Sequence, residues 1–248
     1  MNQYLSSASL KSLAKGQLLG KYGTVVTACL LHYACTFFVD FNIATIADTT
    51  SVLGNILFYI LTLLSGLLNG VFLYGEAYLF MKIACSQHVT SHDLFYGFRN
   101  DTDKVLRVQF IITLVGMICA LPNLLLANVM ATPGDTKLMT ISIALYVVAT
   151  AVNVYFNLVF SQCYFLLLDF PNYSPKELFR ASYKLMKGNK GRLLYIELSF
   201  LPLYLLGILS CCVSFLWVLP YFQAVKANFY LDLIKKQPYT PSNHTQEN

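Results

Sequence analysis

Residues 53–80 have the sequence LGNILFYILTLLSGLLNGVFLYGEAYLF, in which Glu76 is the only charged side chain. About 20 apolar helical residues cross the roughly 30 Å hydrocarbon core of a bilayer. This run is longer than one crossing needs, so we expect it to tilt or to project beyond the lipid. It lacks the alternation of polar and apolar residues typical of a barrel strand, which predicts a transmembrane helix.

The composition of the whole chain indicates the same class of protein. Of its 248 residues, 56% are hydrophobic and only 12% are charged, whereas soluble domains carry about 25% charged residues. Seven cysteines lie mostly inside apolar runs and have no CxxC spacing, so neither a disulfide framework nor a zinc site is expected. The chain is therefore predicted to be a helical membrane protein.

Six apolar runs bounded by charged residues predict six transmembrane helices in an all-α bundle. These runs lie at 23–40, 53–80, 106–129, 138–168, 193–209 and 211–231. The first is expected to be retained, because no small-x-small cleavage site follows it. Pro122, Pro202 and Pro220 predict kinks within their spans. Together the spans form one predicted membrane domain, 1–236, followed by a disordered cytoplasmic tail, 237–248.

The placement of the basic residues predicts the orientation of the chain. Sixteen of the 17 lysines and arginines precede the first, third and fifth spans or lie at the end of the sixth. Lys137 is the only one expected on the opposite side. Cytoplasmic segments of membrane proteins carry an excess of lysine and arginine, so both termini are predicted to be cytoplasmic.

Three segments on the predicted cytoplasmic side share one pattern, in which apolar and charged residues alternate at helical spacing before a span. They lie at about 9–20, 91–105 and 175–187. Leu10, Leu94 and Leu178 are spaced 84 residues apart, which predicts three repeats of an amphipathic helix followed by a transmembrane hairpin. The alternative is the same physical pattern without a common ancestor.

The third of these segments has the clearest helix signals. Ser174, Pro175 and Glu177 predict a capping box with proline at the first helical position, and Gly188 predicts the stop. Its basic residues are candidates for contact with anionic lipid headgroups or a partner protein. They are Lys176, Arg180, Lys184, Lys187, Lys190 and Arg192. An ordinary linker helix on the cytoplasmic side would need the same residues.

Four stretches together resemble a known family. They are LKSLAKGQLLGKYG (10–23), DLFYGF (93–98), SPKELFRASYKLMKGNKGRLLYIELSF (174–200) and FLWVLPYFQAVKANFYLDL (215–233). In this order the chain resembles the bacterial integral-membrane family catalogued as domain of unknown function 975. The arginine-glycine pair usual in that family after the second span appears here only as Lys82. The resemblance implies a polytopic protein of the bacterial cytoplasmic membrane without an established activity, and it supplies no catalytic residues.

Three ionisable residues, His32, Glu76 and Glu197, lie within the predicted spans or near their ends. Ionisable groups in a bilayer are costly, and they are candidates for transport or proton coupling. The structural alternative is an interfacial carboxylate paired with a lysine, or a neutral histidine bonded between helices.

The predicted span 138–168 carries a polar stripe at helical spacing, which runs from Ser142 to Tyr164. Its candidate site residues are Thr150, Asn153, Asn157 and Ser161. Such a stripe either bonds neighbouring helices together, which we favour, or forms the wall of a hydrated cavity. In the second span, Gly66 and Gly70 have the GxxxG spacing that predicts close helix approach.

Motifs of common enzymes are missing from the sequence. It contains no GxSxG, no GxxxxGK[ST] and no HExxH, so we expect no enzymatic activity, no metal site and no cofactor. The basic residues follow the predicted membrane boundary, so no nucleic-acid partner is expected.

The sequence favours a non-enzymatic, multi-pass membrane protein with an accessory or envelope-related role. Its basic cytoplasmic helices would contact anionic lipid, a membrane-protein partner or a second copy of the chain. The alternative is a small transporter or channel that uses the polar stripe together with His32, Glu76 and Glu197.

Overall fold

The computed structural model describes residues 4–46, 51–131, 136–210 and 213–236. Every element within these ranges is a helix, which confirms the predicted all-α class. The predicted disordered tail, 237–248, lies outside the described residues.

Four long helices form two hairpins. They are α2 (Tyr22–Ile46) with α3 (Val52–Ala84), and α5 (Thr102–Ala131) with α6 (Thr136–Phe160). The other elements are shorter or come later in the chain: α1 (Ser7–Leu18), η1 (Ser91–Phe95), α4 (Tyr96–Arg99), α7 (Cys163–Asp169), α8 (Pro175–Met186), α9 (Lys190–Leu198), α10 (Leu201–Leu209) and α11 (Phe215–Lys236).

Five segments of the described chain are long and apolar enough to cross a membrane. They are Tyr22–Ile46, Val52–Ala84, Thr102–Pro122, Thr136–Asp169 and Lys190–Leu209. The sixth predicted span, 211–231, falls mostly in α11, which is not among the five. The structure therefore supports five of the six predicted spans.

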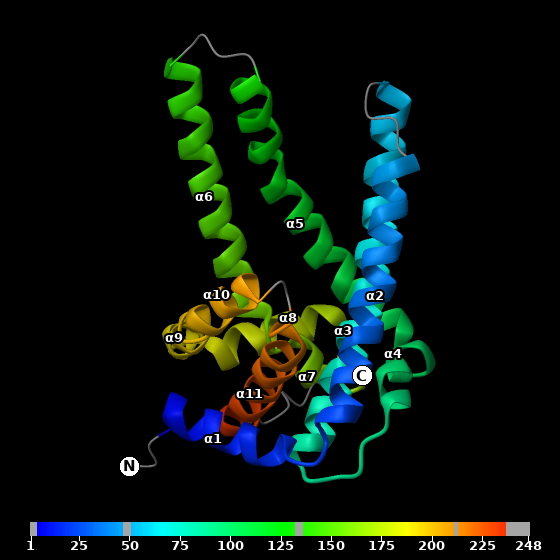
Figure 1. Cartoon of the computed structure of the whole chain (residues 1–248), viewed down its shortest axis with the longest axis vertical. Helices are drawn as coiled ribbons and strands as arrows, with labels where there is room; N and C mark the ends of the chain where they lie inside the picture. The colour runs from blue at the N-terminus through cyan, green and yellow to red at the C-terminus, as the bar shows by residue number, and fades with distance from the viewer. Residues whose placement is uncertain (1–3, 47–50, 132–135, 211–212, 237–248) are drawn as a thin grey trace, which may run out of the picture.

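Both long hairpins extend in the same direction from a common base (Figure 1). The base, which we call the basal end, holds α1, η1, α4 and α8 to α11. Helix α3 lies at its centre and contacts α2, α5, α7 and α11 as well as η1 and α4. None of α8 to α11 extends beside the upper halves of the hairpins in Figure 1.

Apolar side chains are buried in the lower part of α3 and in α11, and they are exposed toward the hairpin tips and on α10. Tyr74, Phe80 and Tyr230 are almost fully buried, whereas Val52 and Leu53 are 79% and 78% exposed. A soluble protein rarely exposes so much contiguous apolar surface. The exposed upper surface is compatible with contact between side chains and lipid.

Glycine residues bring α3 close to its neighbours. A Cβ atom at Gly70 would lie 2.2 Å from Cγ of Gln109, and one at Gly66 would lie 2.5 Å from Cγ2 of Thr113. Both contacts are with α5, which confirms the close approach predicted from the GxxxG spacing.

Three predicted elements are divided in the structure, and one of them is the predicted span 138–168, which forms α6 and α7. Residues 91–105 form η1, α4 and the start of α5, because Asp101 has a positive φ of 54° and turns the chain. The predicted span 193–209 forms α9 and α10. The kink predicted at Pro202 is wrong, because this residue lies in the first turn of a new helix, where proline is well tolerated.

The local signals of the third basic segment are confirmed. Ser174 caps α8, accepting a hydrogen bond from the Glu177 N–H, while the Glu177 carboxylate accepts one from the Ser174 N–H. Gly188 has φ +83°, a conformation that glycine adopts without strain, and it lies just after the helix.

Candidate functional site

A buried polar network connects three helices in the middle of the molecule. His32 on α2 and Glu76 on α3 are each only 1% exposed, and their Nδ1 and Oε1 atoms lie 2.8 Å apart. The other ring nitrogen of His32 lies 2.8 Å from Oδ1 of Asn69. Nε2 of Gln223, on α11, donates to the second Glu76 oxygen at 2.9 Å. Glu76 therefore links the first hairpin to α11.

The hydrogen bonds of His32 define how many protons the network holds. Oδ1 of Asn69 can only accept, so Nε2 of His32 donates and carries a hydrogen. One further proton then lies between Nδ1 and Glu76 Oε1, either on the imidazole or on the carboxyl group. In both arrangements the pair is neutral overall, which lowers the cost of burying it.

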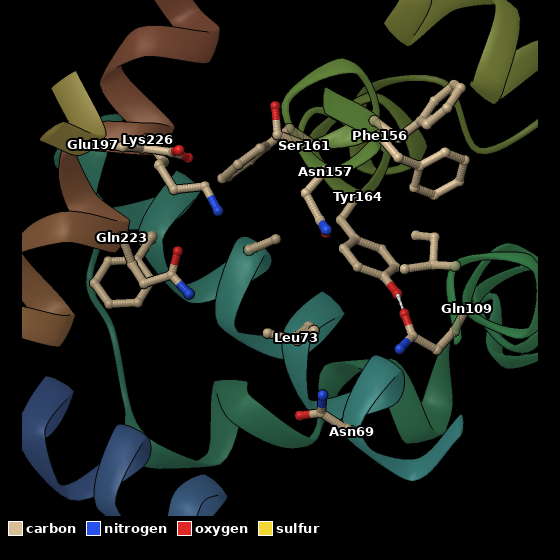
Figure 2. Close-up of a pocket in the computed structure, with 15 residues that line it drawn as sticks. Asn69, Leu73, Gln109, Phe156, Asn157, Ser161, Tyr164, Glu197, Gln223 and Lys226 are labelled. Carbon is tan, nitrogen blue, oxygen red and sulfur yellow. Dashed lines mark hydrogen bonds between the residues drawn. The ribbon is translucent and has the colours of Figure 1, made fainter. Parts of the chain in front are cut away.

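A cavity of about 430 Å³ lies beside this network. Its wall comes from α3, α5, α6, α7, α9 and α11, and the side chains that line it are shown in Figure 2. Asn69 and Gln223 belong both to this wall and to the buried network. Asn69 and Gln223 therefore connect the buried His32 and Glu76 pair directly to the cavity.

The cavity combines polar and aromatic side chains. Tyr164 donates a hydrogen bond to Gln109 across one side of it (Figure 2). Phe156, Phe160 and Phe165 supply apolar surface nearby. Ligand pockets in proteins are mostly apolar with a few polar groups that fix orientation, and this wall has that character.

Two oppositely charged groups border the cavity from different helices. Glu197 comes from α9 and Lys226 from α11. Among the described residues, no ion pair within 4.0 Å joins them to each other or to another side chain. Figure 2 shows the Lys226 side chain extending into the cavity.

The predicted polar stripe is divided by its surroundings. Asn157, Ser161 and Tyr164 line the cavity, whereas Thr150 is exposed and Asn153 is partly exposed. Nδ2 of Asn157 donates to the backbone oxygen and to Oδ1 of Asn153, within the same helix. In the described chain, no hydrogen bond joins Thr150, Asn153 or Asn157 to a neighbouring helix.

Two of the six basic residues proposed to contact lipid or a partner instead form contacts within the protein. Arg192 forms an ion pair of 2.9 Å with Asp232, and it also donates to the Leu5 backbone oxygen at 3.0 Å. Lys190 donates to the hydroxyl of Tyr155 at 2.6 Å. These contacts connect α9 to α11, to the N-terminal segment and to α6.

The other four basic candidates, Lys176, Arg180, Lys184 and Lys187, are exposed on and just after α8. The apolar face of α8 is covered by the protein itself: Leu178 and Met186 are fully buried, and the Ser182 hydroxyl donates to the Val159 backbone oxygen at 2.7 Å. Only the basic face of this helix is left for a further contact.

Comparison with protein families gives the identity of the chain at family level. The family described as protein of unknown function (DUF975) matches residues 1–237. The chain belongs to this family. No curated protein and no solved structure matches it. The resemblance inferred from the four sequence stretches is thereby confirmed, and the function of this DUF975 protein must be argued from its own residues.

Several cavity residues were not singled out from the sequence. Lys226 contributes only to the charge pattern that predicts the orientation, and Gln109 and Gln223 belong to no motif in the sequence. A glutamine in an apolar run is itself a signal, because an amide without a partner is costly in lipid. Their meeting at one cavity depends on helix packing that a single sequence does not contain.

Proposed function

We propose that this DUF975 protein is a non-enzymatic, multi-pass protein of the bacterial cytoplasmic membrane that carries a small polar solute. The solute binds in the cavity beside His32 and Glu76. The single observation that carries the proposal is a polar, charge-lined cavity of about 430 Å³ among helices that are otherwise apolar. Polar and ionisable groups at membrane depth are costly and are retained for function.

Two features support this function over an accessory role based on lipid contact. The apolar face of α8 is already buried within the protein, so this helix has no free apolar face to insert into a bilayer. Asn157, in the lower part of the polar stripe, lines the cavity and donates only within α6, while Tyr164 at the end of the stripe bonds to Gln109 on α5. The cavity is also wide enough for several water molecules, since each needs roughly 30 Å³ in the liquid.

The orientation follows from contacts between the two ends of the chain. Leu5 N–H donates to the Asp232 carboxylate at 3.2 Å, and Asn228 donates to Gln17 at 2.7 Å. The two terminal segments therefore lie on one side of the membrane, which requires an even number of crossings between them. The four crossings of the two hairpins satisfy this requirement, as do the six that the sequence predicts, and the excess of basic residues favours the cytoplasm for that side.

Cysteine labelling tests whether the cavity is open to water. In a variant without native cysteines, we expect Asn157→Cys to react with a water-soluble maleimide in native membranes, because a thiol needs water to ionise. The matched control is Val148→Cys on the same helix, where Val148 is 61% exposed on the apolar surface. If Asn157→Cys is as unreactive as Val148→Cys, the cavity is dry and the proposal is wrong.

A second, separate role is supported by the exposed basic face of α8. Its four exposed basic side chains have no ion-pair partner among the described residues. A lysine or arginine near an anionic membrane surface gains about 1 kcal/mol. We expect the whole protein to retain phosphatidylglycerol over phosphatidylcholine in native mass spectrometry, and to lose this preference when the four residues are changed to glutamine. An unchanged preference would leave a protein partner or a second copy as the occupant of this face.

A further inference from the structure

Glu197 and Lys226 face one cavity and attract each other across it, but neither forms an ion pair within 4.0 Å in the part of the chain that the structure describes. The nearest recorded contact of the Lys226 ammonium is the ring of Phe222, whose centre lies 5.5 Å away. A charge removed from water is costly unless it is paired and hydrogen-bonded. Two opposite charges that face one cavity can both be compensated by a single ligand that carries both signs.

The amide groups of the cavity wall are oriented by the buried network. Nε2 of Gln223 is used by Glu76, which leaves the Gln223 oxygen as an acceptor for a ligand. Oδ1 of Asn69 is used by His32, which leaves the Asn69 amide nitrogen as a donor. The cavity therefore offers an amide acceptor from α11 and an amide donor from α3 in addition to its two charged groups.

We propose that the solute of this cavity is a small zwitterion, whose ammonium group binds Glu197 and whose carboxylate or phosphate binds Lys226. This inference rests on the proposed function and deepens it. A singly charged ligand would contact only one of the two protein charges. The volume of about 430 Å³ suits an amino acid or a phosphoethanolamine group, because drug-sized ligands occupy pockets of roughly 300–1,000 Å³. Two kinds of molecule carry such a zwitterionic group: a free solute and the headgroup of a zwitterionic lipid.

Thermal unfolding of the whole protein in phosphatidylglycerol nanodiscs provides the test. The free probes are L-alanine and phosphoethanolamine, and the singly charged controls are acetate and ethylamine. At about ten times its Kd, a bound zwitterion is expected to raise the unfolding midpoint by roughly 3–6 °C. Acetate and ethylamine are expected to have no effect. The measurement is repeated in nanodiscs that contain phosphatidylethanolamine. If the unfolding midpoint is already raised there and the free probes raise it no further, the bound group is the lipid headgroup.

Variants link any such shift to the two charges. Glu197→Gln and Lys226→Met are each expected to lose it, while Lys15→Met, which removes an exposed lysine on α1, is expected to keep it. If Lys226→Met does not fold, the exchange Glu197→Lys with Lys226→Glu takes its place. The exchange keeps one charge of each sign and is expected to retain the response.

Equal shifts with acetate or ethylamine, or a full zwitterion response in Lys226→Met, would overturn the inference and leave a carrier for another polar solute. The absence of a response to any zwitterion in either lipid would overturn it as well. Neither result affects the proposed function, which fails only if the cavity is dry by the Asn157→Cys labelling test.

Discussion

His32 and Glu76 are the most deeply buried ion pair among the described residues. Removing one partner of a buried pair leaves the other without compensation and typically costs about 3–5 kcal/mol. We expect Glu76→Gln to lower the free energy of unfolding by about 3 kcal/mol, measured by denaturant titration in detergent. Gln223 loses its acceptor in the same variant.

A double-mutant cycle separates the pair from general damage to the core. Each single change leaves the remaining partner buried without its hydrogen bond. The double variant His32→Leu with Glu76→Leu is therefore expected to lose less free energy of unfolding than the two single variants together. Asp103→Asn, which changes an exposed carboxylate at the start of α5, is the control and should stay within about 0.5 kcal/mol of the native protein. A loss in Glu76→Gln no larger than in this control would contradict an ionic contact.

Gly75 is the glycine at which α3 approaches another backbone most closely. A Cβ atom at this position would lie 1.8 Å from the Leu94 carbonyl oxygen, so Gly75→Ala must move η1 away from α3. We expect it to destabilise the protein by about 1–3 kcal/mol in thermal unfolding. Gly116→Ala is the matched control, since its Cβ atom would meet nothing within 4 Å. It is expected to be neutral or stabilising by up to about 1 kcal/mol through helix propensity.

At the scale of elements, η1 is held to the end of α3 by Asp93. Burial disfavours the ionised carboxylate, but hydrogen bonds from the Thr90 N–H and from Lys82, together with the Lys82 charge, lower the pKa of Asp93 below its ordinary value. A lowered pKa means that the folded segment binds protons less readily than the unfolded one. Its stabilising contribution is therefore complete above the ordinary pKa of the carboxyl group and is lost as the pH falls through the lower folded value.

Hydrogen exchange of residues 86–99 measures this pH dependence. We expect protection, corrected for the intrinsic exchange rate, to be constant between about pH 5 and 7 and to fall below about pH 4. Asp93→Asn is expected to show weaker protection that no longer depends on pH in this range. A native segment that keeps full protection at pH 3 would show that the Lys82 contact contributes nothing.

The sequence predicted elements well where the signal is local. Residues 53–80 gave the core of α3, and the capping box and Gly188 gave both ends of α8, because hydropathy and capping depend on neighbouring residues. The turn at Asp101 and the break between α9 and α10 were missed. Their local sequence also permits a continuous helix, and at Asp101 the packing of η1 against α3 favours the turn.

The cavity could be predicted only in part, for the same reason. His32, Glu76 and Glu197 were identified individually, since an ionisable residue in an apolar run stands out without any tertiary information. Their partners come from α3 and α11, and no spacing in the sequence pairs residue 32 with 76 or 76 with 223. The polar stripe was expected to bond to neighbouring helices. Tyr164 does so through Gln109, while Asn157 faces a cavity that exists only between packed helices.

For the whole molecule, the contacts between α1 and α11 allow a specific prediction of the membrane topology. The hydroxyl of Tyr221 donates to the Lys11 backbone oxygen, and Arg192 and Asp232 bind the backbone of Leu5. These contacts hold both terminal segments at the basal end, opposite the hairpin tips (Figure 1), so we expect the termini on one side of the membrane and the tips on the other. In intact cells, a membrane-impermeant maleimide should therefore label Thr136→Cys, at the start of α6, and leave Lys187→Cys unlabelled.

Both variants are made in the cysteine-free background, and each is checked by its unfolding midpoint. After the cells are broken, Lys187→Cys should be labelled as completely as Thr136→Cys, which proves that its thiol is exposed and that the membrane alone protected it. Labelling of Lys187→Cys in intact cells with Thr136→Cys protected would reverse the orientation, because lysine-rich segments would then face outward against the charge rule. Labelling of both thiols in intact cells would show that residues 136 and 187 lie on the same, outer side of the membrane. The basal end would then not be cytoplasmic, and the even number of crossings between the termini would be wrong.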